Sequence, residues 1–272
     1  FLRQLVEKVE KDWPGVVSVL EEMRSLLFNR QALICNVTLD AANWQQFRPQ
    51  LEAFLGELPD QAPAPRSWQI PAGVFTEGLT IPAQVNYVGK GADLYALGFQ
   101  RNGSLEGILN YLRTTWLWEK IRVQGGAYGA FSLFNPRSGV LTFLSYRDPN
   151  LAQTLQVYDQ TAQFLRQLDG GRLSQEELTR SIIGVIGSLD AYQLPDTKGY
   201  TSLARYLAGE TDEQRQVWRD QVLSTSAQDF FQLADILEKM RDQAAIVVLG
   251  GQEALQSLQV QYLDRLELRR VL

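Results

Sequence analysis

The stretch that decides the fold runs from residue 102 to residue 146 and reads NGSLEGILNYLRTTWLWEKIRVQGGAYGAFSLFNPRSGVLTFLSY. Apolar residues recur at helical spacing over residues 105–121, which predicts an amphipathic helix. Two consecutive glycines, 125–126, then interrupt the helical pattern. Strand-forming runs follow at residues 127–134 and 139–146, and the turn residues between them predict a hairpin. The stretch therefore predicts a helix that is followed by an antiparallel pair of strands.

The segments on either side extend this pattern into an α+β domain. Upstream, residues 84–88 form the clearest strand, and residues 94–99 are a second candidate. Downstream, a helix is expected over residues 149–168, and residues 244–249 predict a buried strand. Further helices are expected to begin at capping boxes led by Ser174, Thr211 and Ser226. This order of elements predicts helices packed on one face of a mostly antiparallel sheet.

The first part of the chain predicts a smaller and mainly helical region. Helical spacing over residues 1–27 is interrupted by Pro14, which predicts two helices or a kink. Residues 31–38, QALICNVT, are apolar and partly β-branched and predict a strand. Residues 41–57 return to helical spacing. The single cysteine, Cys35, lies in the apolar run and is expected to be a buried structural thiol.

A proline-rich segment at residues 59–65, PDQAPAP, predicts a stiff linker. The helix-strand-helix of about 58 residues before it is smaller than a typical domain. We therefore interpret residues 1–59 as the C-terminal tail of a preceding domain, residues 60–66 as the linker, and residues 67–272 as a complete C-terminal domain. We expect the chain to be a fragment of a longer protein.

Composition excludes several kinds of partner and site. The net charge of −5 comes from interspersed acids and bases with no basic block, so nucleic acid is not an expected partner. No run of about 18 or more apolar residues occurs, so no membrane-spanning helix is expected. One cysteine excludes an internal disulfide, which permits a reducing compartment without fixing one.

The sequence contains no histidine. Histidine is the commonest metal ligand and the commonest general base in proteins. Without it, a Ser-His-Asp triad is impossible, and a zinc site would need more than the one cysteine present. We therefore expect no metal site in this chain and no hydrolysis by the chain alone.

The most unusual short stretch is the turn that contains Gly125 and Gly126, with Arg122 before it and Tyr128 after it. A guanidinium and a phenol that converge from both sides of a turn would suit a developing oxyanion. Each residue also has a structural interpretation. Arg122 at a helix C-terminus complements the helix dipole, and Tyr128 at the start of a strand is often half-buried packing.

Residues 122–130, RVQGGAYGA, resemble the R-x-x-x-G-x-Y element in the C-terminal half of pitrilysin-family (inverzincin) zinc metallopeptidases, and are most similar to the presequence protease branch. Three further segments resemble the same branch in the same order. They are residues 85–89 (VNYVG), residues 145–150 (SYRDPN), and Asp190 together with residues 195–199 (PDTKG). Four elements in register form a much more specific signal than any one of them. The resemblance covers about residues 80–250.

The resemblance implies an enzyme of two halves that close around a chamber. The N-terminal half would carry the inverted motif H-x-x-E-H and bind the zinc cofactor. The C-terminal half would bind no zinc and would supply an arginine and a tyrosine, which match Arg122 and Tyr128. These two would be catalytic, and Gly125 and Gly126 would join them in binding substrate. By the same resemblance, residues 1–59 would end the third domain and residues 67–272 would form the fourth.

The partners implied are the N-terminal half of the same protease and short unstructured peptides such as cleaved targeting peptides. Because H-x-x-E-H is absent, this chain alone is expected to be inactive. The alternative is a scaffold subunit of the same family that has lost catalysis. The branch occurs in organelles and has bacterial relatives, so the compartment stays open. Residues 85–88 are either a core strand or a chamber-wall strand to which peptide adds, and Arg147 is a further candidate for the chamber wall.

Overall fold

The computed structural model describes residues 1–60, 67, 69, 76–168, 172–261 and 266–271. The chain divides into two compact units. Unit 1 comprises Phe1–Pro71 with Gln193–Gly209, and unit 2 comprises Ala72–Tyr192 with Glu210–Leu272. The predicted linker, residues 60–66, lies outside the described residues except for Asp60. The assignment of the chain to a third and a fourth domain stays a prediction.

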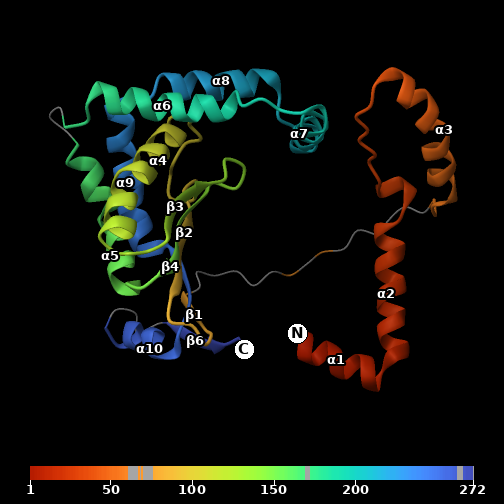
Figure 1. Ribbon diagram of the computed structural model, residues 1–272, viewed down its shortest axis with the longest axis horizontal. Coiled ribbons are helices and arrows are strands. Elements are labelled where there is room, and N and C mark those ends of the chain that lie inside the picture. Colours follow the sequence, from red (N-terminus) through yellow and green to blue (C-terminus); the bar gives the residue numbers. More distant parts are fainter. Residues whose placement is uncertain (61–66, 68, 70–75, 169–171, 262–265, 272) are drawn as a thin grey trace. The chain divides into compact units, whose positions relative to one another are not determined.

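Unit 2 is built on a six-stranded sheet with the strand order β3-β4-β2-β5-β1-β6 (Figure 1). Its strands are β1 (Thr76–Thr80), β2 (Asn86–Asp93), β3 (Gly129–Phe134), β4 (Val140–Asp148), β5 (Ala245–Gly250) and β6 (Glu267–Arg270). The neighbours β3–β4, β4–β2 and β2–β5 are antiparallel, whereas β5–β1 and β1–β6 are parallel. The predicted hairpin is confirmed as β3 and β4, and the strand predicted near residue 245 is confirmed as β5.

Helices cover one face of this sheet, which confirms the α+β prediction. Figure 1 shows α4, α5 and α9 along the same side of the central strands. The helices of unit 2 are α4 (Ser104–Thr114), α5 (Leu151–Arg166), α6 (Gln175–Leu189), α8 (Asp212–Leu223), α9 (Ala227–Gln243) and α10 (Gln252–Gln261). The three predicted capping boxes are confirmed at the starts of α6, α8 and α9. Helix α10 and strand β6 were not predicted.

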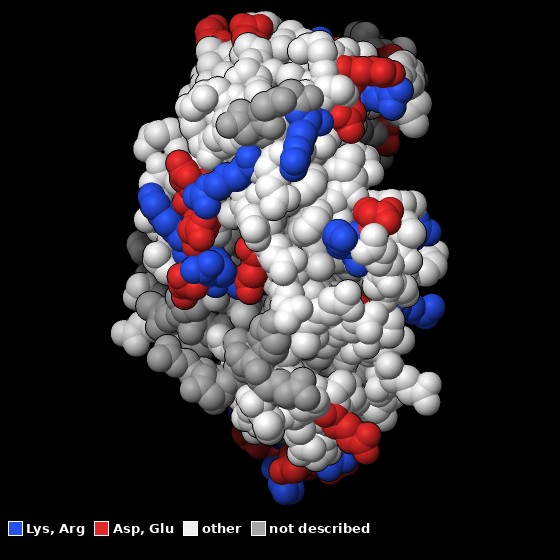
Figure 2. Space-filling view, turned by 90° about the vertical axis from the view of Figure 1, so that its left-hand side faces the viewer, with Lys and Arg blue, Asp and Glu red and all other residues white. Residues whose placement is uncertain are grey.

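The core of unit 2 lies between that sheet face and the helices. Alternate residues of the strands point into it, among them Val88, Phe143 and Val248. The helices contribute Leu112 and Phe230, both fully buried. On the outer side of the helices, acidic and basic side chains are interspersed (Figure 2). No helix in the described parts of the chain is long and apolar enough to cross a membrane.

The prediction of one continuous helix over residues 105–121 is wrong. Helix α4 ends at Thr114, and a separate π-helix, η2 (Trp118–Val123), follows. Thr114 and Thr115 explain the break. Their hydroxyls donate to the carbonyl oxygens of Asn110 and Tyr111 at 2.9 and 2.6 Å, and such side-chain bonds destabilise and bend a helix.

The strand proposed at residues 94–99 is also wrong. Strand β2 instead continues through Gly89 and Gly91 to Asp93, and a turn follows. The Asp93 carboxylate accepts a hydrogen bond of 2.9 Å from the amide of Tyr95, which forms the side-chain turn that ends the strand. Gly98 completes the turn with a φ of 97°, in the left-handed region that favours glycine.

Unit 1 contains the helices α1 (Leu2–Lys11), α2 (Trp13–Leu27), α3 (Ala41–Glu57) and α7 (Pro195–Ala208). Residues 1–27 were predicted to form two helices or a kinked helix, and two helices, α1 and α2, are confirmed. Asp12 caps α2, and Pro14 lies in its first turn. The strand predicted at residues 31–38 is wrong. A short 3₁₀ helix, η1 (Arg30–Ala32), begins the segment, and residues 33–38 have no regular secondary structure. Among residues 1–60 and 193–209, unit 1 contains no strand with which this segment could pair.

The side chains of unit 1 are far more exposed than those of unit 2. Across its described residues, the only buried one is Asn29, and no apolar side chain is buried. The predicted burial of Cys35 is therefore wrong, since this thiol is exposed. The apolar pattern around Cys35 was a signal of burial, but no core forms around it in the described part of unit 1.

Candidate functional site

The π-helix η2 positions Arg122. Ile121 is buried and anchors the helix to the core, while Arg122 on the next position is half-buried. The wider turn is visible in the bond from the amide of Gln124 to the carbonyl of Glu119, which measures 2.9 Å. The Arg122 guanidinium lies over the ring of Trp118 at 4.0 Å from the ring centroid, a cation–π contact that orients the charged group.

The two glycines after η2 have different and specific reasons to be glycine. A Cβ on Gly125 would come within 2.5 Å of the Ile121 carbonyl oxygen, so a side chain does not fit there. Gly126 has a φ of 74°. The turn is closed by hydrogen bonds from the Gly126 amide to the Arg122 carbonyl at 3.0 Å and from the Ala127 amide to the Ile121 carbonyl at 3.1 Å. The side chain of Asn150 also donates to the Gly125 carbonyl.

Tyr128 leaves this turn on the face of the sheet that the helices do not cover. Its side chain is 68% exposed, so half-buried packing does not describe it. Its amide donates to the Tyr146 carbonyl at 3.0 Å, which fixes the backbone. Its ring meets that of Tyr146 edge-on at 5.8 Å, and Tyr146 in turn meets Tyr87 at 5.3 Å.

The geometry places Arg122 and Tyr128 on either side of one closed turn and leaves both accessible. Within the described residues, the Arg122 guanidinium has no carboxylate partner and the Tyr128 hydroxyl makes no hydrogen bond. In the described part of the chain, no hydrogen bond or cation–π contact joins the two side chains. Arg122 still lies in the last turn of η2, so its interaction with the helix dipole holds alongside any other role.

The sequence analysis assigned no role to three neighbours of these residues: Trp118, Tyr146 and Tyr87. The π-turn that brings Trp118 under Arg122 has no clear sequence signal. The suggestion that peptide adds as a strand at residues 85–88 is wrong, because β2 is paired on both sides, by β4 and β5. The alternative, a core strand, is confirmed by Val88, which is buried.

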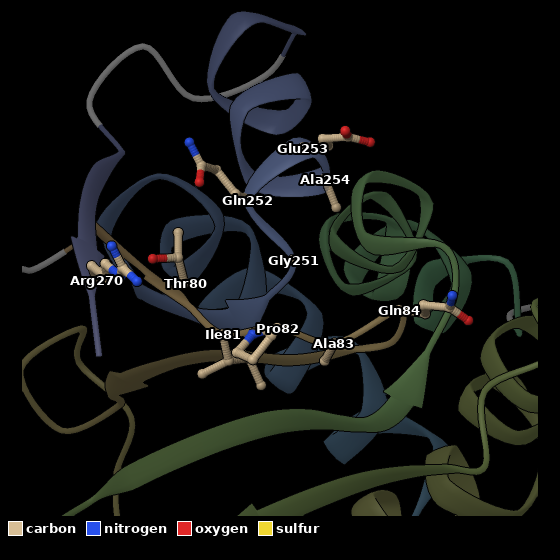
Figure 3. Close-up of a pocket in the computed structure, with 10 residues that line it drawn as sticks. All are labelled: Thr80, Ile81, Pro82, Ala83, Gln84, Gly251, Gln252, Glu253, Ala254 and Arg270. Carbon is tan, nitrogen blue, oxygen red and sulfur yellow. The ribbon is translucent and has the colours of Figure 1, made fainter. Parts of the chain in front are cut away.

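A pocket of unit 2 lies away from this turn. It has a volume of about 740 Å³ and lies where the segment after β1 meets the start of α10, with Arg270 of β6 on its rim (Figure 3). Strands β4, β2 and β5 separate β1 from β3. None of its lining residues belongs to the turn that carries Arg122 and Tyr128.

The residues that the structure describes do not form a zinc site. Across the described ranges, no three His, Cys, Asp or Glu side chains gather in a group that could hold a metal ion. The sequence also lacks histidine and has one cysteine, which is exposed. The zinc that the family resemblance implies is therefore not held by the residues described here.

The sequence of this chain is similar to those of known proteins. Its sequence matches the family model described as "PreP C-terminal domain" over residues 76–252. It is 42% identical over 273 residues to "Presequence protease 1, chloroplastic/mitochondrial" of Arabidopsis thaliana, across 100% of this chain and 25% of the relative. It is 27% identical over 250 residues to "Protein HypA" of Clostridium perfringens, across 92% of this chain and 25% of the relative.

Among solved structures, a protease from Helicobacter pylori has a similar fold, with a TM-score of 0.50 and 17% identity across 75% of this chain and 52% of that one. The architecture of unit 2 is thus a fold that is also found in that protease. The chain belongs to the PreP C-terminal domain family, and its resemblance to presequence proteases is confirmed. It spans about a quarter of the length of the curated relatives that it matches.

Proposed function

We propose that this chain is the part of a zinc metalloendopeptidase that binds no zinc, and that Arg122 and Tyr128 act on the peptide bond that is cut. The observation that supports the proposal is the accessible and unpaired state of both donors on one rigid turn. The N-terminal half of the same protease would hold the zinc and would be the chain's partner. Membership of the PreP C-terminal domain family supports this division of labour.

The chemistry follows from the donor types. When water attacks a peptide carbonyl, negative charge develops on the carbonyl oxygen. A guanidinium offers charged N–H donors and a phenol offers an O–H donor, and donors already fixed in place stabilise that charge without reorganisation. Trp118 restrains the Arg122 side chain, and the bond from the Tyr128 amide to Tyr146 restrains the other arm. The exposed backbone at Gly126 would lie beside the bound peptide, next to Gly125.

We further propose that the substrates are short unstructured peptides such as cleaved targeting peptides, which enter a chamber that folded proteins cannot enter. The Arabidopsis relative is named as a chloroplastic and mitochondrial presequence protease, and the relatives from Emericella nidulans and mouse are named as mitochondrial presequence proteases. These names support an organellar location and presequence substrates. A cytoplasmic location is the alternative, and fractionation of the source cells distinguishes the two.

The test is steady-state hydrolysis of an unstructured peptide by the full-length enzyme that contains this chain. We expect Tyr128→Phe and Arg122→Ala each to lower kcat by about 10²–10³-fold, because each removes one oxyanion donor. Tyr200→Phe and Arg137→Ala are matched controls, since both residues are exposed and lie outside the turn. Full turnover in both site variants would refute the proposal, and a full-length protein without any peptidase activity would favour the scaffold alternative.

A further inference from the structure

Arg147 has an unusual backbone conformation. Its φ is 49°, and it is the one non-glycine residue with a positive φ in the described chain. An L-residue with a long side chain rarely adopts this left-handed region, whereas glycine enters it freely. Backbone outliers of this kind persist only where the surroundings hold them, and they concentrate at functional sites.

The surroundings of Arg147 hold it from both sides. The pairing between β2 and β4 shifts register here, from Asn86 opposite Asp148 to Val88 opposite Ser145, so Arg147 lies in a β-bulge. The Asn86 side chain donates to the Asp148 carbonyl at 2.9 Å. The Asp148 carboxylate is fully buried and accepts from the Asn150 amide at 2.8 Å and from the Thr154 hydroxyl at 2.6 Å.

The bulge determines where the Arg147 guanidinium lies. The group is exposed and stands over the ring of Tyr146 at 5.7 Å from its centroid. The neighbouring carboxylate, Asp148, is already occupied by its own hydrogen bonds in the core and does not neutralise it. Among the described residues, Arg147 makes no ion pair, so the bulge presents an unneutralised cation on the open face of the sheet.

Tyr146 connects this cation to the proposed site. Its ring contacts Tyr128 on one side, and its carbonyl accepts from the Tyr128 amide. Tyr128, Tyr146 and Arg147 therefore form a contiguous strip at the end of β4, and Arg122 lies on the other side of the glycine turn from Tyr128. A planar guanidinium with free N–H groups binds a carboxylate with two parallel hydrogen bonds.

We propose that Arg147 is a substrate-binding residue that takes a carboxylate of the peptide, either its C-terminal group or an acidic side chain, beside the bond that Arg122 and Tyr128 act on. This inference rests on the proposed function and extends it. It explains why an arginine, and not glycine, occupies a position whose backbone favours glycine. The strained conformation is kept because it aims a cation at the substrate.

The test separates strain from function with Arg147→Gly in the full-length enzyme. Glycine relieves the backbone and removes the guanidinium. We expect the melting temperature to rise by about 2–5 °C, while KM rises about 10-fold or more for a peptide with the recognised carboxylate and kcat changes less than about 3-fold. Arg147→Lys, which keeps a charge but loses the paired N–H geometry, should raise KM by a smaller factor. Arg137→Gln is the control for loss of an exposed arginine.

The peptide series identifies the carboxylate. One peptide is compared with its C-terminal amide and with a version in which Glu is replaced by Gln, and binding of each to the zinc-free enzyme is measured by fluorescence anisotropy. The modification that removes the recognised group should weaken binding to wild type and leave binding to Arg147→Gly unchanged. Equal KM and equal binding for wild type and Arg147→Gly with all three peptides would overturn the inference. If Arg122 and Tyr128 variants lose turnover in that case, the proposed function stands without it. Full turnover in those variants would instead refute the proposed function.

Discussion

Unit 1 and unit 2 have similar amphipathic helices but very different interiors. Every buried apolar side chain in the described chain belongs to unit 2, where the sheet and helices close around Phe143, Phe230 and their neighbours. In unit 1, helix α1 has an apolar side that includes Leu2, Val6 and Val9, and all three are exposed. The difference shows that an apolar stripe in the sequence is enough to predict a helix. Burial of that stripe requires another apolar surface that packs against it.

The largest effect should come from the same substitution made in both units. Phe143 is 1% exposed in unit 2, and Phe54 is 55% exposed in unit 1. We expect Phe143→Ala to lower the free energy of unfolding by about 3–5 kcal/mol, because it leaves a cavity in a packed core. Phe54→Ala should change it by less than about 0.5 kcal/mol. Urea titration followed by near-UV circular dichroism measures both, and equal losses would contradict the contrast between the units.

A buried charge sharpens the comparison further. Lys90 lies on the covered face of the sheet, 4% exposed, and donates to Asp159 and to the Arg241 carbonyl at 2.9 Å. Asp159→Asn should cost about 2–4 kcal/mol, because it leaves a buried ammonium without its counter-charge. The matched change in unit 1 is Asp60→Asn, which breaks the exposed pair with Arg30.

The Asp60→Asn variant should cost less than about 0.5 kcal/mol, since exposed pairs contribute little. The double variant Lys90→Met with Asp159→Leu serves as a control and should recover most of the loss, because it removes both charges from the core. Chemical denaturation of all three variants gives the numbers. A large loss in Asp60→Asn would mean that unit 1 has a tightly packed region after all.

Helix caps should give a smaller difference. Ser174 begins α6 in unit 2, and its hydroxyl accepts from the Glu177 amide at 3.2 Å. Ser174→Ala should lower the unfolding free energy by about 1 kcal/mol. Asp12 caps α2 in unit 1 by accepting from the Gly15 amide at 3.1 Å. Asp12→Ala should reduce far-UV helicity without moving the main unfolding transition, and a shift of that transition would couple α2 to a cooperative core.

The smallest effect should be a pH dependence of opposite sign in the two units. Burial raises the pKa of Glu106 in α4, so the wild type loses stability as pH rises from the ordinary glutamate range through the raised value. Glu106→Gln should therefore gain relative stability on going from pH 4 to pH 8. In unit 1, a hydrogen bond from the Asn43 backbone amide lowers the pKa of Asp40. The stability that the ionised Asp40 contributes is lost as pH falls through that lowered pKa. Urea midpoints and helicity against pH measure the two signs.

Local pattern was enough to predict much of the fold of unit 2. The hairpin of β3 and β4, strand β5 and three helix starts depend on neighbouring residues, and sequence shows these directly. The parallel pairing of β1 with β5 and β6 joins segments far apart in the chain, so it carries no local signal. The errors near Thr115 and at residues 31–38 have physical causes. Threonine hydroxyls ended one helix, and a strand-like segment had no strand to pair with among the described residues of unit 1.

The candidate site also divides into residues that the sequence predicted and contacts that it did not predict. The glycine pair and its flanking residues, Arg122 and Tyr128, are contiguous, so sequence and family resemblance both pointed to them. Their roles remain predictions. The contact between Arg122 and Trp118 depends on a π-turn, and the left-handed Arg147 depends on a bulge opposite Asn86. The bulge arises from how two distant strands pair, and the π-turn is local but has no clear sequence signal.

The hydrogen bond from Asn150 to the Gly125 carbonyl has a mechanical consequence. It ties the glycine turn to the first turn of α5, while the Tyr128 amide ties the other end to β4. The turn therefore has no freedom to swing as an independent flap. Under the proposed function, the two arms would therefore approach a substrate held elsewhere by movement of unit 2 as a whole, not by movement of a local loop.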